Sequence, residues 1–233
     1  MPATSGLHGM VVNELGAEIA QGRVAANEIL NVSDLCERFG VSRSVIRESL
    51  RALESLGLVK ARPQVGTRVM GIGNWDLLNA QVVNWRGYGP GYATQMNELL
   101  EMRRGVEGSA ARLAATRMTD TERRQLRVVA DQLIAAAGSK NGREWVAADV
   151  AFHRLVLEGS HNTVMAQFAD TVAAVLRTRQ DTDRRTITDQ TPQSVNNHTS
   201  LADALIDGDP DLAEVSAIRI VDSTLKEFEH ADY

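Results

Sequence analysis

One segment restricts the fold of this chain more than any other, NVSDLCERFGVSRSVIRESLRALESLGLVKARPQVGTRV, which covers residues 31–69. A short helix is expected to begin among the polar residues around Ser33, its expected N-cap, and to end at Gly40. A second helix begins after its N-cap Ser42 and keeps apolar residues at helical spacing. Two short β-compatible runs with a Pro and a Gly between them then predict a hairpin. Preceded by an amphipathic helix over residues 7–20, this order predicts a winged helix-turn-helix.

Three arginines mark one face of the second predicted helix. Arg43, Arg47 and Arg51 are spaced four residues apart, so they form a single stripe. Guanidinium groups pair with guanine edges and with phosphates, so we expect Arg43 and Arg47 to contact bases. Arg51 lies further along the helix and is expected to meet phosphate or to pair with Glu48 or Glu54. The alternative is a solvated helix face with ion pairs between neighbouring turns.

The start of the same helix adds further donors. Ser42 and Ser44 place hydroxyls where backbone N–H groups also point outward, which suits phosphate binding. Gly66, in the hairpin, would let the backbone approach DNA closely. The candidate DNA-binding residues are therefore Ser42, Arg43, Ser44, Arg47, Arg51 and Gly66.

The overall charge gives DNA binding no support by itself. The chain has a formal net charge of −5, but the first 70 residues hold 8 Lys and Arg against 7 Asp and Glu. A DNA-binding face must therefore come from the local placement of the arginines. A homodimer on a palindromic double-stranded operator would place two such helices on the DNA at once. Two helices acting together explain how a weakly charged domain can bind DNA.

Composition divides the chain into three parts. Residues 1–70 are the expected DNA-binding domain, and the glycine-rich residues 71–92 are an expected linker with a short helix between Trp75 and Trp85. Residues 93–233 are expected to form an antiparallel helical bundle, so the predicted fold is mainly α. Its predicted helices cover residues 94–117, 119–137, 142–158, 161–180, 192–207 and 210–230.

Other features limit the class of protein. Cys36 is the single cysteine, which excludes an internal disulfide and a zinc site built from several cysteines. The chain has no N-terminal signal pattern, and no apolar run approaches the roughly 18 residues that a spanning helix needs. We therefore expect a soluble, cytoplasmic protein without a membrane partner.

The helix predicted over residues 142–158 carries candidate metal ligands. Asp149 and His153 are four residues apart and share a helix face with apolar neighbours. Burying a carboxylate and an imidazole there is costly unless they are paired or bind a metal. His198, on a later helix, is a third candidate. A plain Asp–His hydrogen bond is the alternative. Three N/O ligands with open positions suit a divalent metal, with zinc expected and nickel or manganese as alternatives.

The segment LCERFGVSRSVIRESLRALESLGLVKARPQVGTRV resembles the DNA-binding domain of the GntR family of bacterial transcription regulators. The resemblance implies DNA contacts from the two serines and from Arg43 and Arg47, with Gly66 at the wing. The chain departs from the family pattern in two places. VAANEIL replaces the usual Pro-Gly after the first helix, and Ser33 stands where a basic residue is common. The matching positions are Val41, Ser42, Arg43, Arg47, Glu48, Leu50, Leu53, Gly57, Leu58, Val59 and Gly66.

The segment DVAFHRLVLEGSHN is similar to a motif of the FadR-type C-terminal domain (FCD domain) of the same family. This resemblance implies an all-helical bundle that binds a metal through Asp149, His153 and His198. A further histidine of the family pattern falls near Ile220, which cannot bind metal. The nearest oxygen donor is Asp222, which would replace that histidine only if the last helix turned its side chain inward.

A third similarity concerns the effector. EMRRGVEGSAARLAA resembles a helix of the same domain and places Arg103 and Glu107 four residues apart. They form an ion pair inside the bundle, or Arg103 faces the cavity and binds an acidic effector. Ser194, one turn before His198, is a second candidate contact. WDLLNAQVVNW resembles a linker helix of family members that respond to sugar acids such as galactonate or gluconate.

Together these features predict a homodimeric repressor that a small carboxylate, expected to be a sugar acid, releases from its operator. The alternatives are an activator, a DNA-binding protein with a vestigial pocket, and a metal-dependent hydrolase. No separate general base or nucleophile accompanies the three ligands, which disfavours the hydrolase and predicts that the protein is not an enzyme.

Overall fold

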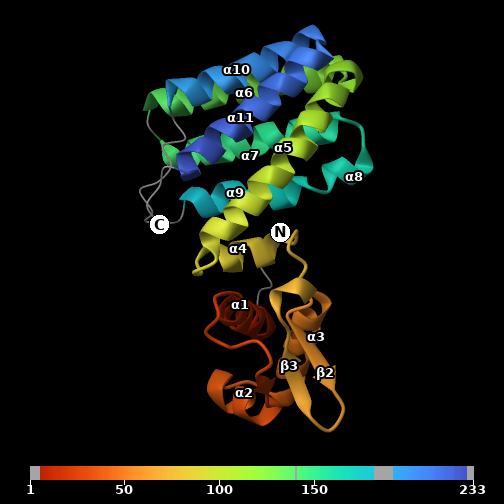
Figure 1. Ribbon diagram of the computed structural model, residues 1–233, viewed down its shortest axis with the longest axis vertical. Helices are drawn as coiled ribbons and strands as arrows, with labels where there is room; N and C mark the ends of the chain where they lie inside the picture. The colour runs from red at the N-terminus through yellow and green to blue at the C-terminus, as the bar shows by residue number, and fades with distance from the viewer. Residues whose placement is uncertain (1–5, 140, 181–190, 230–233) are drawn as a thin grey trace. The chain divides into compact units, whose positions relative to one another are not determined.

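The computed structural model describes residues 6–139, 141–180 and 191–229. The chain folds into two compact units, Met1–Tyr92 and Ala93–Tyr233, each described here by itself (Figure 1). Both are mainly helical, and the described strands all belong to the first unit. The mainly α fold predicted from the sequence is confirmed. No helix in the described part of the chain combines the length and apolar character needed to cross a membrane.

Three helices form the core of the first unit: α1 (Leu7–Ala20), α2 (Val32–Phe39) and α3 (Arg43–Ser55). The prediction that Ser33 caps α2 is wrong. Asn31 is the N-cap, and its side-chain oxygen accepts the backbone N–H of Ser33 at 2.8 Å. Asn and Ser cap helices about equally well, so the backbone conformation decided which of them lies outside the first turn.

The turn between α2 and α3 follows the prediction. Gly40 ends α2 in the left-handed region, at φ 63°, and Val41 is buried beneath the turn with 9% exposure. Ser42 caps α3 by accepting the backbone N–H of Val45. Buried side chains of α3, among them Ile46 and Leu53, then pack in the same apolar core as α1. This packing fixes which face of α3 is left exposed.

The hairpin consists of β2 (Val59–Arg62) and β3 (Gly66–Val69), and it gains a third strand that the sequence did not reveal. Strand β1 (Ile29–Leu30) pairs with β3, so the antiparallel order is β1-β3-β2. Gly66 has φ +116°, and a Cβ there would lie 2.9 Å from Cγ2 of Ile29. The glycine is therefore needed for the backbone angle and for the approach of β1.

The helix between the two predicted domains is shorter than its apolar spacing suggested. Helix α4 (Ala80–Gly87) follows the N-cap Asn79, and a 3₁₀ turn, η1 (Ile72–Asn74), precedes it. Trp75 is extended and donates its indole N–H to the Met70 carbonyl at 2.9 Å. In α4, Val82 and Trp85 join the core of the first unit.

The second unit is a bundle in which α7 packs against α6 and α9, and α10 packs against α6 and α11. The helix predicted over residues 161–180 starts only at Thr163, because His161 has a positive φ of 48° and Asn162 is the N-cap. It ends after one turn at Ala166, and a separate helix begins at Ala169. The helices described in this unit are α5 (Tyr92–Arg117), α6 (Asp120–Ser139), α7 (Gly142–Gly159), α8 (Thr163–Ala166), α9 (Ala169–Gln180), α10 (Pro192–Asp207) and α11 (Pro210–Glu229).

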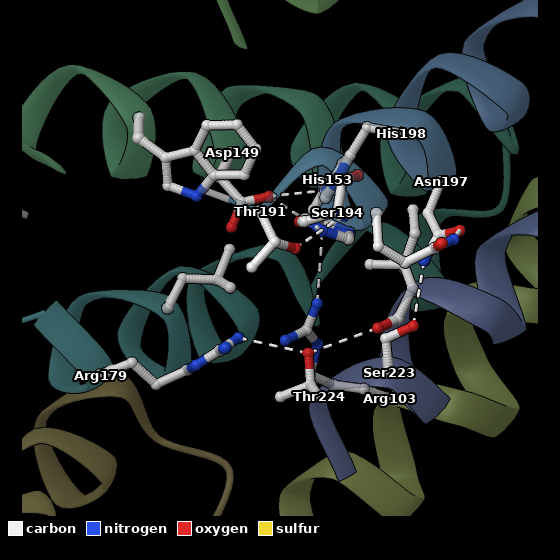
Figure 2. A pocket seen from close by; sticks show the side chains of 14 residues that line it. Arg103, Asp149, His153, Arg179, Thr191, Ser194, Asn197, His198, Ser223 and Thr224 are labelled. Carbon is white, nitrogen blue, oxygen red and sulfur yellow. Dashed lines mark hydrogen bonds and ion pairs between the residues drawn. The ribbon is translucent and has the colours of Figure 1, made fainter. Parts of the chain in front are cut away.

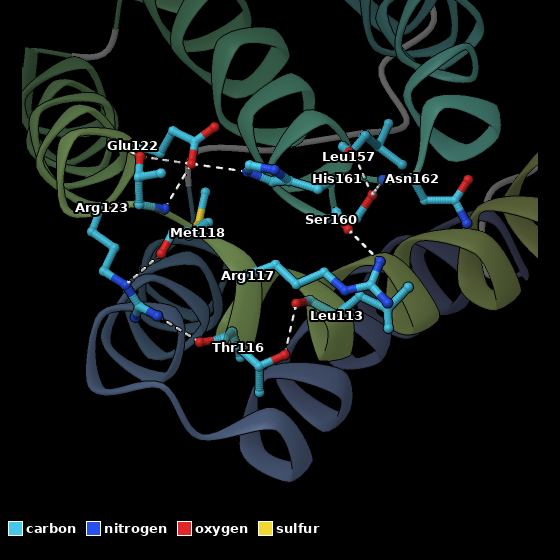
Figure 3. Close-up of polar contacts among 12 residues, drawn as sticks. Leu113, Thr116, Arg117, Met118, Glu122, Arg123, Leu157, Ser160, His161 and Asn162 are labelled. Atoms are coloured by element: carbon cyan, nitrogen blue, oxygen red, sulfur yellow. Dashed lines mark hydrogen bonds and ion pairs between the residues drawn. The ribbon is translucent and has the colours of Figure 1, made fainter.

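Side chains at one end of this bundle satisfy helix-end groups (Figure 3). Thr119 and Glu122 form a capping box, because the Thr119 N–H donates to Glu122 Oε2 at 2.7 Å and Thr119 Oγ1 accepts the Glu122 N–H. Arg123 donates to the carbonyls of Leu205 and Ala115, near the ends of α10 and α5. Such contacts join helices that are far apart in the sequence and hold the bundle that contains the site below.

Candidate functional site

The first candidate site is the exposed face of α3. Arg43, Arg47 and Arg51 are all exposed, as the predicted stripe requires, while Ile46 and Leu50 on the opposite side are buried. Ser42 and Ser44 are exposed at the start of the helix. Their hydroxyl oxygens lie 2.8 Å apart, so the helix N-terminus presents them together.

The arginines of this face have different neighbours. Arg43 donates to Ser33 Oγ at 3.0 Å, so α2 orients its guanidinium. Arg51 pairs with Glu48 at 2.5 Å between Nη1 and Oε1. Arg47 and Arg51 also line a groove between α3 and the hairpin. The groove's other lining residues are Val32, Leu50, Glu54, Ala61, Arg62, Gln64, Gly66 and Thr67.

The second candidate site is a polar cluster inside the bundle, shown in Figure 2. Asp149 and His153 come from α7, and His198 comes from α10. All three are buried, with exposures of 4%, 2% and 3%. Asp149 Oδ1 lies 3.0 Å from His198 Nε2 and 3.2 Å from His153 Nε2. One potential ligand atom from each residue therefore falls within 4.8 Å of the others.

The remaining ring nitrogens fix the orientation of both imidazoles. His198 Nδ1 lies 2.8 Å from the Ser194 carbonyl, and His153 Nδ1 lies 2.5 Å from Glu107 Oε2. Each Nδ1 therefore carries the proton, and each Nε2 turns toward Asp149. A neutral Nε2 has a lone pair, and so does the carboxylate, so only a proton or a cation can bridge them. The spacing of about 3 Å suits ligands around one divalent ion, whose bonds to N and O are about 2.0–2.2 Å.

Strong local charges shift the pKa values of the cluster. Burial alone would raise the pKa of Glu107, but the charges of Arg103 and His153 outweigh it and lower that pKa to about 2. Burial would lower the pKa of His153, but Glu107 and Asp149 raise it to about 9. The pKa of Asp149 falls well below its usual value, because hydrogen bonds from the two histidines outweigh its burial. Without a metal, the proton held by His153 takes the place of a cation.

Arg103 and Glu107, four residues apart on α5, are in direct contact. Arg103 Nε lies 2.5 Å from Glu107 Oε1, and the two residues are 1% and 2% exposed, so they form an ion pair inside the bundle. Arg103 also lines the cavity, and its Nη2 lies 3.4 Å from His153 Nε2. The ion pair is therefore formed, and Arg103 also reaches the cavity wall. Glu107 was not among the expected site residues, yet it orients His153.

Asp222 does not extend the cluster. Its side chain is 37% exposed, and its Oδ1 accepts Arg104 Nε at 2.7 Å. Ile220 lines the cavity instead. The last helix thus turns its carboxylate outward, and this candidate for a fourth ligand is excluded. Within the described residues, Asp149, His153 and His198 are the group that can hold a metal.

The cluster forms one wall of a small cavity with a volume of about 50 Å³. Ser194, expected as an effector contact, lines it, as does Trp145, whose ring packs edge-on to His198. Several lining residues were not expected from the sequence, because isolated polar residues on separate helices give no pattern. They are Arg179, Thr191, Gln193, Asn197, Ser223 and Thr224.

Two family descriptions match the chain. Residues 7–69 match the bacterial regulatory proteins of the gntR family, and residues 98–223 match the FCD domain. The first match contains the α2–α3 turn and the hairpin. The second contains the buried cluster and most of the cavity lining.

Individual relatives agree with these matches. The galactonate operon transcriptional repressor of Escherichia coli (strain K12) is 28% identical over 222 residues, which are 93% of this chain and 94% of that protein. The uncharacterized HTH-type transcriptional regulator YieP of the same organism is 29% identical over 214 residues, 91% of each chain. Among solved structures, Lar, which controls the expression of the Listeria monocytogenes agr system, aligns with a TM-score of 0.64 at 16% identity. That alignment covers 98% of this chain and 99% of Lar, and it shows the shared fold.

Proposed function

Because the chain belongs to the GntR family of bacterial transcription regulators and carries an FCD domain, we propose that it is a repressor that an acidic effector releases from its operator. It is a DNA-binding regulator and not an enzyme. The observation that carries the effector proposal is the buried cluster, in which two histidine Nε2 atoms and Asp149 Oδ1 converge beside Arg103. The name of the galactonate operon repressor supports both the repressor role and a sugar acid as effector.

The DNA-binding half of the proposal rests on α3. The candidate side chains are all exposed, and we propose that Arg43 and Arg47 contact base edges while Ser42, Ser44 and Arg51 contact phosphates. Gly66 belongs to the wing, where its backbone can lie close to the DNA. We propose that the protein acts as a homodimer in the bacterial cytoplasm, because two recognition helices on a palindromic operator double the contacts of one weakly charged face.

We propose that Asp149, His153 and His198 hold a divalent metal. Zinc is the first candidate and nickel and manganese are the alternatives, because all three accept imidazole and carboxylate ligands. When bound, the metal would supply a Lewis-acidic centre for an oxygen of the effector. Glu107 and the Ser194 carbonyl would keep the imidazoles in the tautomer that such binding needs.

The effector's carboxylate would be held by Arg103, with Ser194 at its side. Arg103 is suited to this because Glu107 fixes its Nε and leaves the end of the guanidinium at the cavity. A sugar acid fits the hydroxyl and amide groups of the lining.

The first test is binding of the full-length protein to the DNA upstream of its own gene, near physiological salt, with and without a panel of sugar acids. Saturable binding that one acid abolishes supports the proposal. An acid that strengthens binding would contradict release and make the protein a ligand-dependent binder. In the variant His153→Ala, the response to the acid should disappear while DNA binding without the acid persists.

A further inference from the structure

The arginine face of α3 receives a contact from the preceding helix, α2. Asn31 caps α2, and its Oδ1 accepts the backbone N–H of Ser33 at 2.8 Å. The hydroxyl of Ser33 therefore takes no part in the cap, and its Oγ accepts Nη2 of Arg43 at 3.0 Å instead. This hydrogen bond joins the first turn of α2 to the first residue of α3, across the turn that connects the two helices.

The three arginines of this face differ in what holds their guanidinium groups. Within the described residues, the hydroxyl of Ser33 is the side-chain partner of Arg43, whereas Arg47 makes no hydrogen bond or ion pair with a side chain. Arg51 pairs with the carboxylate of Glu48. Arg43 is therefore the arginine that is oriented without being neutralised.

A neutral partner leaves Arg43 ready to pair with a base. A guanidinium carries five N–H donors, and bidentate pairing with guanine uses two of them. The single bond to Ser33 can therefore persist while Arg43 contacts a base edge. An ion pair with a carboxylate, as at Arg51, would instead have to be broken before the arginine contacted DNA.

A side chain that is ordered before binding loses less conformational entropy when it docks. Immobilising one long side chain at an interface lowers affinity by a factor of about two to ten. The bond to Ser33 already restricts Arg43 to orientations near the start of α2. Bidentate pairing depends on orientation as well as on charge, so this restriction acts on base preference rather than on the affinity for DNA in general.

We propose that Ser33 is a positioning residue for base selection. Its hydroxyl orients Arg43, and Arg43 then reads one base pair in each half-site. This inference rests on the proposed function, in which the exposed face of α3 binds operator DNA. It adds a residue of α2 to the proposed contacts of α3 and of the hairpin, and that residue acts through an arginine rather than by contacting a base.

The test uses selection from a randomised library of DNA duplexes, so it does not require a known operator. Anisotropy titrations of the selected sequence and of its single-base variants then give the preference of the full-length protein at each position. Ser33→Ala should lower the preference by about three- to tenfold at the position that Arg43→Ala also affects. Its affinity for unrelated DNA should stay within about twofold of the wild-type value.

Three further variants separate positioning from other effects. Ser33→Thr keeps a hydroxyl and should keep most of the preference. Ser55→Ala makes the same exchange at an exposed serine of the same unit, whose hydroxyl donates to the Ala52 carbonyl at 2.7 Å, and it should leave the preference unchanged. Adding Ser33→Ala to Arg43→Ala should have no further effect, because Ser33 acts through Arg43.

The failures of the two proposals are separable. If Ser33→Ala keeps the wild-type preference, or if it weakens binding to all DNA alike, the positioning role is overturned while the DNA-binding face of α3 stands. An equal loss from Ser33→Ala with and without Arg43 would overturn it in the same way. If the wild-type protein selects no sequence, or if Arg43→Ala keeps the full preference, the proposed contacts of α3 fail and this inference fails with them.

Discussion

On α3, Arg51 Nη1 lies 2.5 Å from Glu48 Oε1, and the two side chains are 71% and 58% exposed. In the bundle, Arg103 Nε lies at the same 2.5 Å from Glu107 Oε1, with side chains only 2% and 3% exposed. Water and salt screen the first pair, which makes it energetically weak and leaves Arg51 available for DNA. The second pair is screened far less, so neither partner can be lost without leaving a buried charge. The same pair of groups is therefore easily separated on α3 and firmly held in the bundle.

Replacing the acidic residue of each ion pair with alanine tests whether burial makes the difference between them. Glu107→Ala should destabilise the metal-free protein by about 3–5 kcal/mol, because Arg103 and His153 each lose a buried acidic partner. Glu48→Ala should cost less than about 1 kcal/mol. Urea unfolding followed by circular dichroism measures both. Similar losses in the two variants would show that burial does not distinguish the pairs.

The pH dependence of metal binding tests the cluster alone. Because the pKa of His153 is raised to about 9, the metal-free protein holds a proton there at pH 7 that a metal must displace. Affinity for Mn²⁺ should therefore increase about tenfold for each pH unit between 6.5 and 8.5. Calorimetric titrations across this range measure the slope. His161→Gln, which changes an exposed histidine, should leave the slope as it is.

The metal-free protein should become less stable as the pH rises. The folded-state pKa of His153, about 9, exceeds the ordinary value of 6.5. Its contribution to stability is therefore fully present below pH 6.5 and is lost as the pH rises through 9. Thermal melts in chelator should show a midpoint that falls over this interval. A midpoint that rises with pH would contradict the charge arrangement around His153.

On α3, Arg43→Ala should weaken binding to the cognate operator by about 1–3 kcal/mol and relax base preference at one position of each half-site. The stability of the fold should hardly change, because the Arg43 side chain is exposed and donates to Ser33, which is also exposed. Fluorescence anisotropy with operator variants gives both values. Wild-type affinity in this variant would mean that another face contacts the bases.

The smallest expected effect belongs to Arg51. Arg51→Ala should weaken binding to cognate and unrelated DNA alike, and it should reduce the dependence of log K on log salt by about 1. Titrations at several salt concentrations measure this slope. A loss restricted to the cognate operator would instead assign Arg51 to a base contact.

The sequence determined the features that depend on neighbours along the chain. The end of α2 at Gly40, the Ser42 cap and the arginine stripe were all predicted, because caps and helical periodicity act over a few residues. The pairing of Asp149 with His153 was predicted for the same reason, since residues four apart share one helix face.

Only the tertiary structure decided what depends on packing between distant segments. It added β1 to the hairpin, placed Glu107 of α5 against His153, turned Asp222 outward and lined the cavity with Arg179. None of these has a local pattern, because each depends on the rotation of one helix or strand against another. A helix of given sequence can present the same polar residue to water or to a partner, and the packing of its apolar residues determines which.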